Sequence, residues 1–330
     1  MRLFSRRTPP FVDAAKNRFP DSISELEFPQ LNGLRQGVLI RGENRSNPTL
    51  VVLHGGPGGA YIGGARSWLG FLERNWVVVN WDERGAGLSY SRSVPPTSLT
   101  PRQLSEDALS LVGWLESRFG LGRFYLLAHS FGTLLAPFIL ERAPDRFEGY
   151  IAIGVAPTDV KGESLAYDWT VSRAQELGNR KALGQLKDLG PPPYRPTDNG
   201  LSLRAHWTDE LGGAWEGSTG TREAYRALRA GSEYTWGDLI LRLLPGIRFW
   251  MRHVDKEFSR EPLPQRFARS PVPTTFIQGA DDWMAPASWA KAYFDLLTAP
   301  RKRFHLLDRT GHYPFAQNPE GFVDVMSRLA

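Results

Sequence analysis

Serine, histidine and aspartate, the side chains that together activate a hydroxyl nucleophile, each occur in this sequence beside turn-forming residues. Ser130 lies in the run Ala128-His129-Ser130-Phe131-Gly132, between a strand-like and a helix-like segment. Small neighbours allow a sharp turn that would hold the serine hydroxyl above the edge of a sheet, where it could attack a carbonyl carbon. The pattern therefore predicts a nucleophile at Ser130, with a serine that only caps the next helix as the alternative.

A glycine-rich loop, His-Gly-Gly-Pro-Gly-Gly at residues 54–59, follows another strand-like run. Glycines allow backbone N–H groups to approach a negatively charged oxygen. We therefore predict an oxyanion hole formed by the N–H groups of Gly56 and of Phe131, the residue after the nucleophile. The loop lacks the Lys-Ser/Thr of a phosphate-binding loop and the spacing of a dinucleotide-binding loop, which leaves an ordinary glycine turn as the alternative. We expect His54 to brace the loop by hydrogen bonds.

An acid and a base are predicted in two loops near the end of the chain. Asp281 and Asp282 follow the strand-like run 274–278, and a carboxylate there could orient a histidine and stabilise its cation. Either aspartate could instead form a turn or cap a helix. His312 follows the strand-like run 303–307 and is the predicted general base. The other histidines lie in the glycine loop, beside the serine, inside a predicted strand or in the middle of the chain, and fit that role less well.

Apolar periodicity predicts the elements that must position these residues. We predict strands at 34–40, 50–53, 76–80, 124–128, 150–155, 274–278 and 303–307, and helices at 101–119, 130–142, 221–230, 236–244, 286–297 and 319–329. Thr100 is the predicted N-cap of the helix that starts at Pro101. Strands that alternate with helices predict an α/β protein with a mostly parallel sheet covered on both faces, and ligand sites lie at the carboxyl ends of such strands.

The middle of the chain differs in composition from its two ends. Strand signals are few from 157 to 270, where tryptophan, glycine and charged residues are frequent. We therefore predict a core formed by residues 1–156 and 271–330, interrupted by a helical cap at residues 157–270.

The composition excludes several classes of protein. The 330 residues are 41% hydrophobic and 23% charged, as in globular proteins, and no apolar run is long enough to span a membrane. Residues 1–7 do not resemble a secretory signal, so we predict a cytoplasmic location. The net charge of +5 arises from scattered Lys and Arg, so we predict no nucleic-acid partner, and the lack of a spanning run leads us to predict no membrane partner. The chain has no cysteine and no metal-ligand spacing, so no metal and no cofactor are predicted. The oligomeric state is left open.

These motifs together resemble those of the proline iminopeptidases and their wider relatives in the α/β-hydrolase superfamily. The similar segments are the glycine loop 54–58, the run 82–89, the serine turn 129–132 and the histidine motif 311–319. The run Asp82-Glu83-Arg84-Gly85-Ala86-Gly87-Leu88-Ser89 has Glu where the family has Gln, and we expect Arg84 to bond nearby carboxylates or carbonyls in support of the glycine loop. The resemblance covers about 22–156 and 272 to the end.

The family's acid motif is Gly-x-x-Asp followed by Pro four residues later. Gly279, Asp282 and Pro286 match it, which selects Asp282 over Asp281. The resemblance therefore implies an α/β-hydrolase fold in which Ser130, Asp282 and His312 form a catalytic triad in that chain order.

The resemblance is weaker in the cap, which determines the substrate in this family. Proline iminopeptidases bind the free amino terminus of a peptide with cap carboxylates. Trp215-Glu216-Gly217 resembles one of their motifs and implies that Glu216 binds the amine. The second motif, Glu-Asn-His-Tyr, is absent, and Ser232-Glu233-Tyr234 is a loose substitute that would assign this role to Glu233. A solvated surface position is the alternative for both glutamates.

The implied activity is that of a serine hydrolase that works through an acyl-enzyme. The resemblance points first to an aminopeptidase of the proline iminopeptidase type, releasing a proline-like residue from a short peptide or small molecule. An esterase, lactonase or amidase for small hydrophobic acyl groups, including a biosynthetic one, is one alternative. A ligand-binding protein that has kept the fold and lost turnover is another. Ser130 at the nucleophile position argues against a dehalogenase or epoxide hydrolase, which would use Asp.

Overall fold

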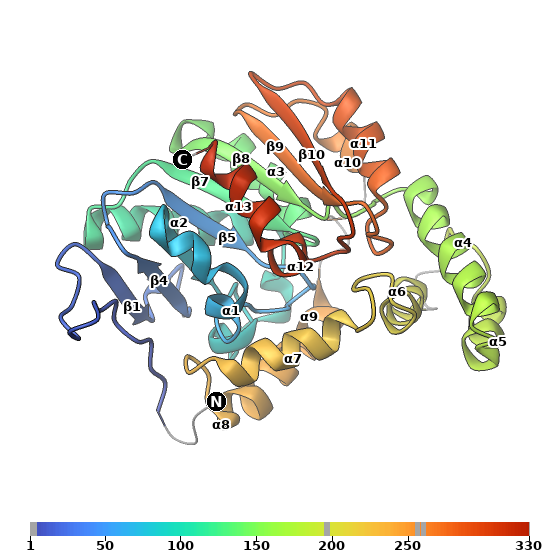
Figure 1. The fold of residues 1–330 in the computed structure, drawn as a ribbon, viewed down its shortest axis with the longest axis horizontal. Coiled ribbons are helices and arrows are strands. Elements are labelled where there is room, and N and C mark those ends of the chain that lie inside the picture. The colour runs from blue at the N-terminus through green and yellow to red at the C-terminus, as the bar shows by residue number, and fades with distance from the viewer. Residues whose placement is uncertain (1–4, 195–198, 255–257, 259–261, 330) are drawn as a thin grey trace.

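The computed structural model describes residues 5–194, 199–254, 258 and 262–329 (Figure 1). The strands are β1 (Ile23–Glu27), β2 (Gln30–Leu31), β3 (Leu34–Arg35), β4 (Val38–Gly42), β5 (Thr49–Leu53), β6 (Val77–Trp81), β7 (Phe124–His129), β8 (Phe147–Ile153), β9 (Thr274–Gly279) and β10 (Lys302–Leu307). Eight of them form one sheet in the order β1-β4-β6-β5-β7-β8-β9-β10. The β1–β4 and β4–β6 pairs are antiparallel and the other pairs are parallel. The predicted α/β class with a mostly parallel sheet is thereby confirmed.

Helices connect the parallel strands and fill the segment between β8 and β9. The α-helices are α1 (Ala65–Leu69), α2 (Pro101–Phe119), α3 (Gly132–Arg142), α4 (Val160–Glu176), α5 (Arg180–Leu189), α6 (Gly200–Glu210), α7 (Gly220–Ala230), α8 (Trp236–Asp238), α9 (Leu244–His253), α10 (Leu263–Arg266), α11 (Ala287–Leu296), α12 (Pro314–Gln317) and α13 (Pro319–Ser327). A π-helical turn, η5 (Leu239–Leu243), joins α8 to α9.

The sheet is covered on both faces. Successive side chains of a strand point to opposite sides, so one strand contributes to two core clusters. Val51 and Leu53 of β5 belong to one core cluster, which also contains the apolar faces of α2, α3 and α11. Leu50 and Val52 of the same strand belong to a second cluster, with α1, α12 and α13. Parallel strands packed in this way expose their carboxyl ends, and the loops there are free to carry a site.

Most predicted elements are present with ends shifted by one to three residues, and one predicted strand is divided in two. The helix predicted at 101–119 is α2, and Thr100 caps it by accepting a hydrogen bond from the Gln103 N–H at 3.1 Å. The strand predicted at 34–40 is divided into β3 and β4. The division lies at Gln36, whose buried side chain donates to Asp107 and accepts from the Trp81 indole. The N–H groups of Gln36 and Gly37 donate to the Pro29 carbonyl and to Ser89 Oγ instead of a neighbouring strand, so the ladder is interrupted there.

The segment from 157 to 270, termed the cap segment below, lies between β8 and β9 and holds α4 to α10. Its residues 195–198, 255–257 and 259–261 lie outside the described part of the chain. Figure 1 shows α4 and α5 projecting beyond the carboxyl ends of the strands, while α7 to α9 pass beneath the core. No helix in the described ranges is both long enough and apolar enough to cross a bilayer.

Candidate active site

Ser130 lies on a strained turn between β7 and α3. Its backbone has φ +52°, a left-handed conformation that costs a non-glycine residue about 1–3 kcal/mol. The Ser130 N–H donates to the Ile153 carbonyl at 2.9 Å, which ties the turn to β8. A methyl group on Gly132 would lie only 2.7 Å from the Leu53 carbonyl oxygen, so α3 starts directly against the end of β5. This close approach raises the serine above the sheet edge and accounts for the glycine two residues after it.

Ser130, His312 and Asp282 are hydrogen-bonded in series. His312 Nε2 lies 2.8 Å from Ser130 Oγ, and His312 Nδ1 lies 2.8 Å from Asp282 Oδ2. A carboxylate only accepts, so the neutral imidazole carries its hydrogen on Nδ1 and presents a free lone pair on Nε2 to the serine hydroxyl. The structure therefore brings together, from three loops at the carboxyl ends of β7, β9 and β10, the residues predicted as nucleophile, acid and base.

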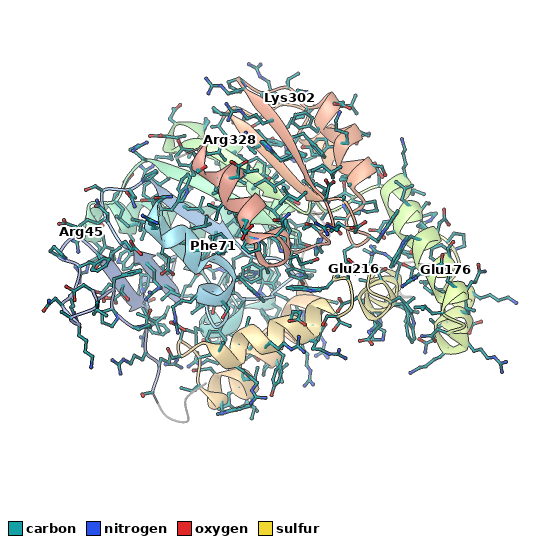
Figure 2. All side chains as sticks on the ribbon, viewed as in Figure 1. Arg45, Phe71, Glu176, Glu216, Lys302 and Arg328 are labelled. Atoms are coloured by element: carbon teal, nitrogen blue, oxygen red, sulfur yellow. The ribbon has the colours of Figure 1, made fainter. Side chains whose placement is uncertain are left out.

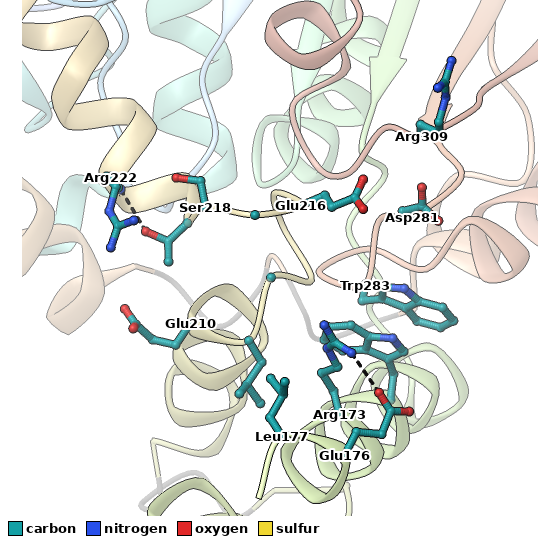
Figure 3. A pocket seen from close by; sticks show the side chains of 15 residues that line it. Arg173, Glu176, Leu177, Glu210, Glu216, Ser218, Arg222, Asp281, Trp283 and Arg309 are labelled. Atoms are coloured by element: carbon teal, nitrogen blue, oxygen red, sulfur yellow. Dashed lines mark hydrogen bonds and ion pairs between the residues drawn. The ribbon is translucent and has the colours of Figure 1, made fainter. Parts of the chain in front are cut away.

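The Asp282 carboxylate is oriented by two further donors. Its Oδ1 accepts from the Ala285 N–H at 2.8 Å, and its Oδ2 accepts from the Gln278 amide at 3.0 Å. Asp281 is exposed and lines a different cavity, where Figure 3 shows its side chain. The arrangement thus distinguishes the two neighbouring aspartates.

Behind His312 lies a buried pair that sequence patterns did not single out. His129 Nε2 lies 2.7 Å from the His312 carbonyl oxygen, and the Tyr61 hydroxyl bonds His129 Nδ1. Since a carbonyl only accepts, Nε2 carries the hydrogen and Nδ1 accepts from Tyr61. Burial and the adjacent His312 ring hold the pKa of His129 well below its usual value, which keeps this ring neutral. The position of His129 beside Ser130 was the one available signal, and nothing in the sequence marked Tyr61.

Two unused backbone N–H groups lie near Ser130, one in the glycine loop and one in the serine turn. Within the described part of the chain, the N–H groups of Gly56 and Phe131 donate to no protein acceptor. Gly56 has φ +133°, and a methyl group there would lie 2.5 Å from the N atoms of Gly58 and Gly59, so only glycine fits. His54 Nδ1 bonds the Gly55 carbonyl and Nε2 accepts from the Glu83 N–H, while burial lowers the His54 pKa to about 4. A neutral His54 therefore braces the loop.

The run 82–89 lies under the glycine loop and is almost wholly buried. Arg84 makes a two-point ion pair with Asp107 at 2.6 and 2.8 Å, which is the kind of contact predicted for it. Asp82 accepts from the Leu88 N–H and the Tyr234 hydroxyl, and burial raises its pKa to about 6. Neither carboxyl oxygen of Glu83 has a hydrogen-bond partner, and burial raises its pKa well above the usual 4.5. Burial therefore favours the protonated, neutral form of Glu83.

Ser130 opens onto an inner cavity of about 210 Å³. Its lining is Gly55, Gly56, Gly59, Ala60, Tyr61, Trp68, His129, Ser130, Ala224, Leu228, Leu243, Ile247, Met284, His312 and Tyr313. Apart from the two imidazoles and the serine, these side chains are apolar or aromatic. No Asp, Glu, Lys or Arg lines this cavity among the described residues. The space beside the nucleophile therefore suits an uncharged apolar group.

Glu216 lines a separate outer cavity of about 590 Å³ (Figure 3). The two cavities share no described lining residue. In Figure 3 the Glu216 and Asp281 side chains approach from the cap segment and the acid loop, with Arg309 beyond them, and Trp283 forms one wall. Figure 2 shows Glu216 between the core and α4, whose last residue is Glu176. The structure thus places Glu216 close to the acid loop but outside the cavity of Ser130.

Glu233 lies in a different place from Glu216. It is buried, its Oε1 accepts from Arg66 at 2.6 Å and its Oε2 accepts from the Ser232 N–H at 2.9 Å. Both carboxylate oxygens are therefore already engaged. Among the described residues, it lines neither the inner nor the outer cavity.

The cap segment is attached directly to the loops that carry the acid and the base. The Trp283 N–H donates to the Gly213 carbonyl, and the His312 N–H donates to the Ala214 carbonyl, both at 2.9 Å. The Gln317 amide also donates to the Ala214 carbonyl at 3.0 Å. Residues 213–214 therefore tie the acid loop and the base loop together. Residues 216–219, which follow in the sequence, line the outer cavity.

The sheet order and the Ser–His–Asp series are typical of the α/β-hydrolase fold, and comparison with known proteins identifies the family. The model of the alpha/beta hydrolase family matches residues 50–325, so the chain belongs to that family. It is 31% identical over 313 residues to a probable aminopeptidase, YbaC, of Bacillus subtilis, covering 94% of this chain and 97% of that one. It is also 31% identical to the esterase EstD of Thermotoga maritima over 195 residues, 56% of this chain and 45% of that one.

Among solved structures, the chain is similar to a proline iminopeptidase-related protein from Thermus thermophilus. The TM-score is 0.66 and the sequence identity is 25%, over 93% of this chain and 96% of that one. These relatives confirm the resemblance to proline iminopeptidases and to esterases, and they identify this protein as a hydrolase of the α/β superfamily.

Proposed function

We propose that this chain is a serine hydrolase that cleaves ester or amide bonds through an acyl-enzyme on Ser130. The observation that carries the proposal is the series Ser130–His312–Asp282, with two contacts of 2.8 Å, beside a cavity that Ser130, His312 and Gly56 line. A nucleophile, a base held in one tautomer and an oxyanion site are the three parts that acyl transfer requires.

The proposed reaction starts with attack of Ser130 Oγ on the substrate carbonyl carbon while His312 Nε2 takes the hydroxyl proton. The N–H groups of Gly56 and Phe131 stabilise the negative charge that develops on the carbonyl oxygen. Asp282 stabilises the resulting imidazolium. The bond to the leaving group then breaks, and the leaving atom takes the proton from His312. Water attacks the acyl-enzyme in the same way, which releases the acid and restores Ser130.

The lining of the inner cavity favours small uncharged acyl groups. Trp68, Leu228 and Ile247 are among the apolar walls, and the described lining includes no carboxylate that could neutralise an ammonium group. Burying an unpaired charge there would cost several kcal/mol, whereas burying apolar surface is favourable by about 25 cal/mol for each Å² removed from water. Esters and amides of short apolar acids are therefore the proposed substrate class.

An aminopeptidase of the proline iminopeptidase type is the second candidate. It is favoured by the position of Glu216 beside Asp281, since neither carboxylate forms an ion pair with another described residue and together they could receive an amine. The name of the Bacillus subtilis relative agrees with this activity. Glu233, the other amine-binding candidate, is less suited because both of its oxygens already accept hydrogen bonds.

Three chromogenic substrates test these proposals: 4-nitrophenyl butyrate, proline 4-nitroanilide and its N-acetyl derivative. An enzyme selective for uncharged acyl groups should cleave the butyrate and prefer the N-acetylated anilide to the free one. An aminopeptidase should show the opposite preference and lose it in Glu216→Gln but not in the control Glu210→Gln, which also lines the outer cavity. Hydrolysis of none of them, with no reaction of Ser130 towards a fluorophosphonate, would favour a non-catalytic ligand-binding protein.

A further inference from the structure

The outer side of the cap segment carries an apolar ridge. α8, η5 and α9 follow one another without a gap from Trp236 to His253. Five large apolar side chains of this stretch are exposed, from 37% for Trp236 to 70% for Leu241. The ridge consists of Trp236, Ile240, Leu241, Leu244 and Met251. Trp236, Ile240 and Leu244 are spaced by four residues, close to one turn of both an α-helix and the π-helical turn η5, so they lie on one side of the stretch.

The opposite side of the same stretch is fixed against the core. Leu243 and Ile247 line the inner cavity. Trp250 is buried, packs edge-on against Phe131 and donates its indole N–H to the Arg84 carbonyl at 2.9 Å. A methyl group on Gly58 would lie 2.7 Å from Trp250, so the helix cannot move closer or turn without a clash. The ridge therefore faces solvent because the inner side is already occupied.

The exposed charged side chains within residues 236–254 are arginines. Arg248 and Arg252 are exposed on the same stretch. The only acidic residue from 236 to 254 is Asp238, which is 3% exposed and accepts from Arg6 at 2.9 Å. Apolar side chains bordered by arginines, with no exposed carboxylate between them, form an amphipathic basic surface.

We propose that the ridge docks on an anionic lipid surface. Its apolar side chains would enter the boundary between headgroups and acyl chains, and Arg248 and Arg252 would lie at the level of the phosphates. Since the inner side of this helix forms a wall of the inner cavity, docking would bring the site of Ser130 next to the lipid phase. The inference departs from the sequence-based expectation of no membrane partner, which rested on the lack of a spanning segment. Peripheral docking needs no such segment.

A second copy of this chain is a poorer occupant of the ridge. In a twofold dimer the same patch contacts itself, so Arg248 and Arg252 of one copy would oppose arginines of the other. The net charge of +5 adds to that repulsion. An anionic lipid surface is complementary to both features of the ridge, because its acyl chains accept the apolar side chains and its phosphates attract the arginines.

The test is co-sedimentation of the full chain with vesicles of phosphatidylcholine alone or with about 30 mol% phosphatidylglycerol added, a composition that gives the surface a negative potential. We expect binding to the anionic vesicles, weak binding to the neutral ones, and weakening of binding at about 0.5 M salt, where charges are screened within about 4 Å. Ile240→Ser/Leu241→Ser should lower the partition coefficient at least about tenfold, since two apolar side chains no longer insert. Arg248→Gln/Arg252→Gln should lower it about thirtyfold, about fivefold for each arginine.

Leu296→Ser is the matched control, because Leu296 is 69% exposed on α11, outside the ridge. It should bind anionic vesicles like the unmodified protein, and unchanged thermal unfolding midpoints would show that all variants are folded. The proposal is overturned if the unmodified protein does not bind anionic vesicles, or if the ridge variants bind as well as Leu296→Ser. It is also overturned if the protein is a dimer that the ridge variants convert to monomers while vesicle binding is absent. The test measures binding, so its outcome is independent of the proposed hydrolase activity.

Discussion

Gly132 provides a strong test of how the serine turn is built. In Gly132→Ala the added methyl group would lie 2.7 Å from the Leu53 carbonyl oxygen and 3.0 Å from Leu53 Cβ, whereas ordinary contacts begin at 3.4 Å. The first contact is with backbone, which cannot rotate away, so the start of α3 must move off β5. Overpacking of this kind costs about 1–3 kcal/mol. A shift of even part of an ångström would also move the Phe131 N–H and Ser130 Oγ, and misplacement by about 1 Å lowers rates about 100-fold.

Gly113→Ala is the matched control. Gly113 lies within α2, and a methyl group there meets nothing within 4 Å. Alanine should therefore raise the free energy of unfolding by about 0.5–1 kcal/mol and leave turnover unchanged. Urea unfolding and the rate of ester hydrolysis are measured for both variants. Gly132→Ala with the stability and the rate of the unmodified protein would refute the account of a turn pressed against β5.

Three further predictions concern the acid, the buried carboxyl and the buried ion pair. Asp282→Asn should lower kcat by about 10⁴-fold with little change in KM, because the amide favours the wrong His312 tautomer; steady-state kinetics that show less than about a tenfold loss would contradict this role. Burial raises the pKa of Glu83 above 4.5, so the folded state binds this proton more tightly and loses stability as pH rises above 4.5. Glu83→Gln should therefore be increasingly stabilising from about pH 5 to pH 8, and a difference in urea midpoint independent of pH would be the contrary result. Arg84→Gln should cost about 3–5 kcal/mol in urea unfolding, since it leaves Asp107 buried without its cation; a loss below about 1 kcal/mol would show that the pair is not needed.

The parts of the fold that depend on local patterns were predictable. α2 has the predicted bounds because its cap, its first-turn proline and its apolar spacing all act within one helix. The helix predicted at 236–244 instead continues through η5 and α9 to His253. Pro245, the residue after the predicted end, lies in the first turn of α9, where its missing N–H is tolerated. Tertiary contacts of Trp250 hold the continuation in place.

The candidate site was predictable where a short motif fixes both residue and turn. Ser130, Asp282 and His312 each follow a strand end, so a parallel sheet brings them to the same edge. The surroundings of the site depend on contacts between distant segments, which motifs do not encode. Glu216 and Glu233 were chosen from cap motifs. The position of Glu216 in the outer cavity depends on how residues 213–214 bond the loops of Trp283 and His312, and that of Glu233 on its bonds with Arg66 and the Ser232 N–H.

Covalent labelling of Ser130 tests the central claim most directly. The protein is treated with a fluorophosphonate, the adduct is measured by intact mass spectrometry and its position is mapped by peptide sequencing. The proposed mechanism predicts one adduct, located on Ser130, that appears in step with the loss of ester hydrolysis and is absent from Ser130→Ala. Ester hydrolysis that persists in Ser130→Ala, or a fully inactivated protein with its adduct on another residue, would contradict it.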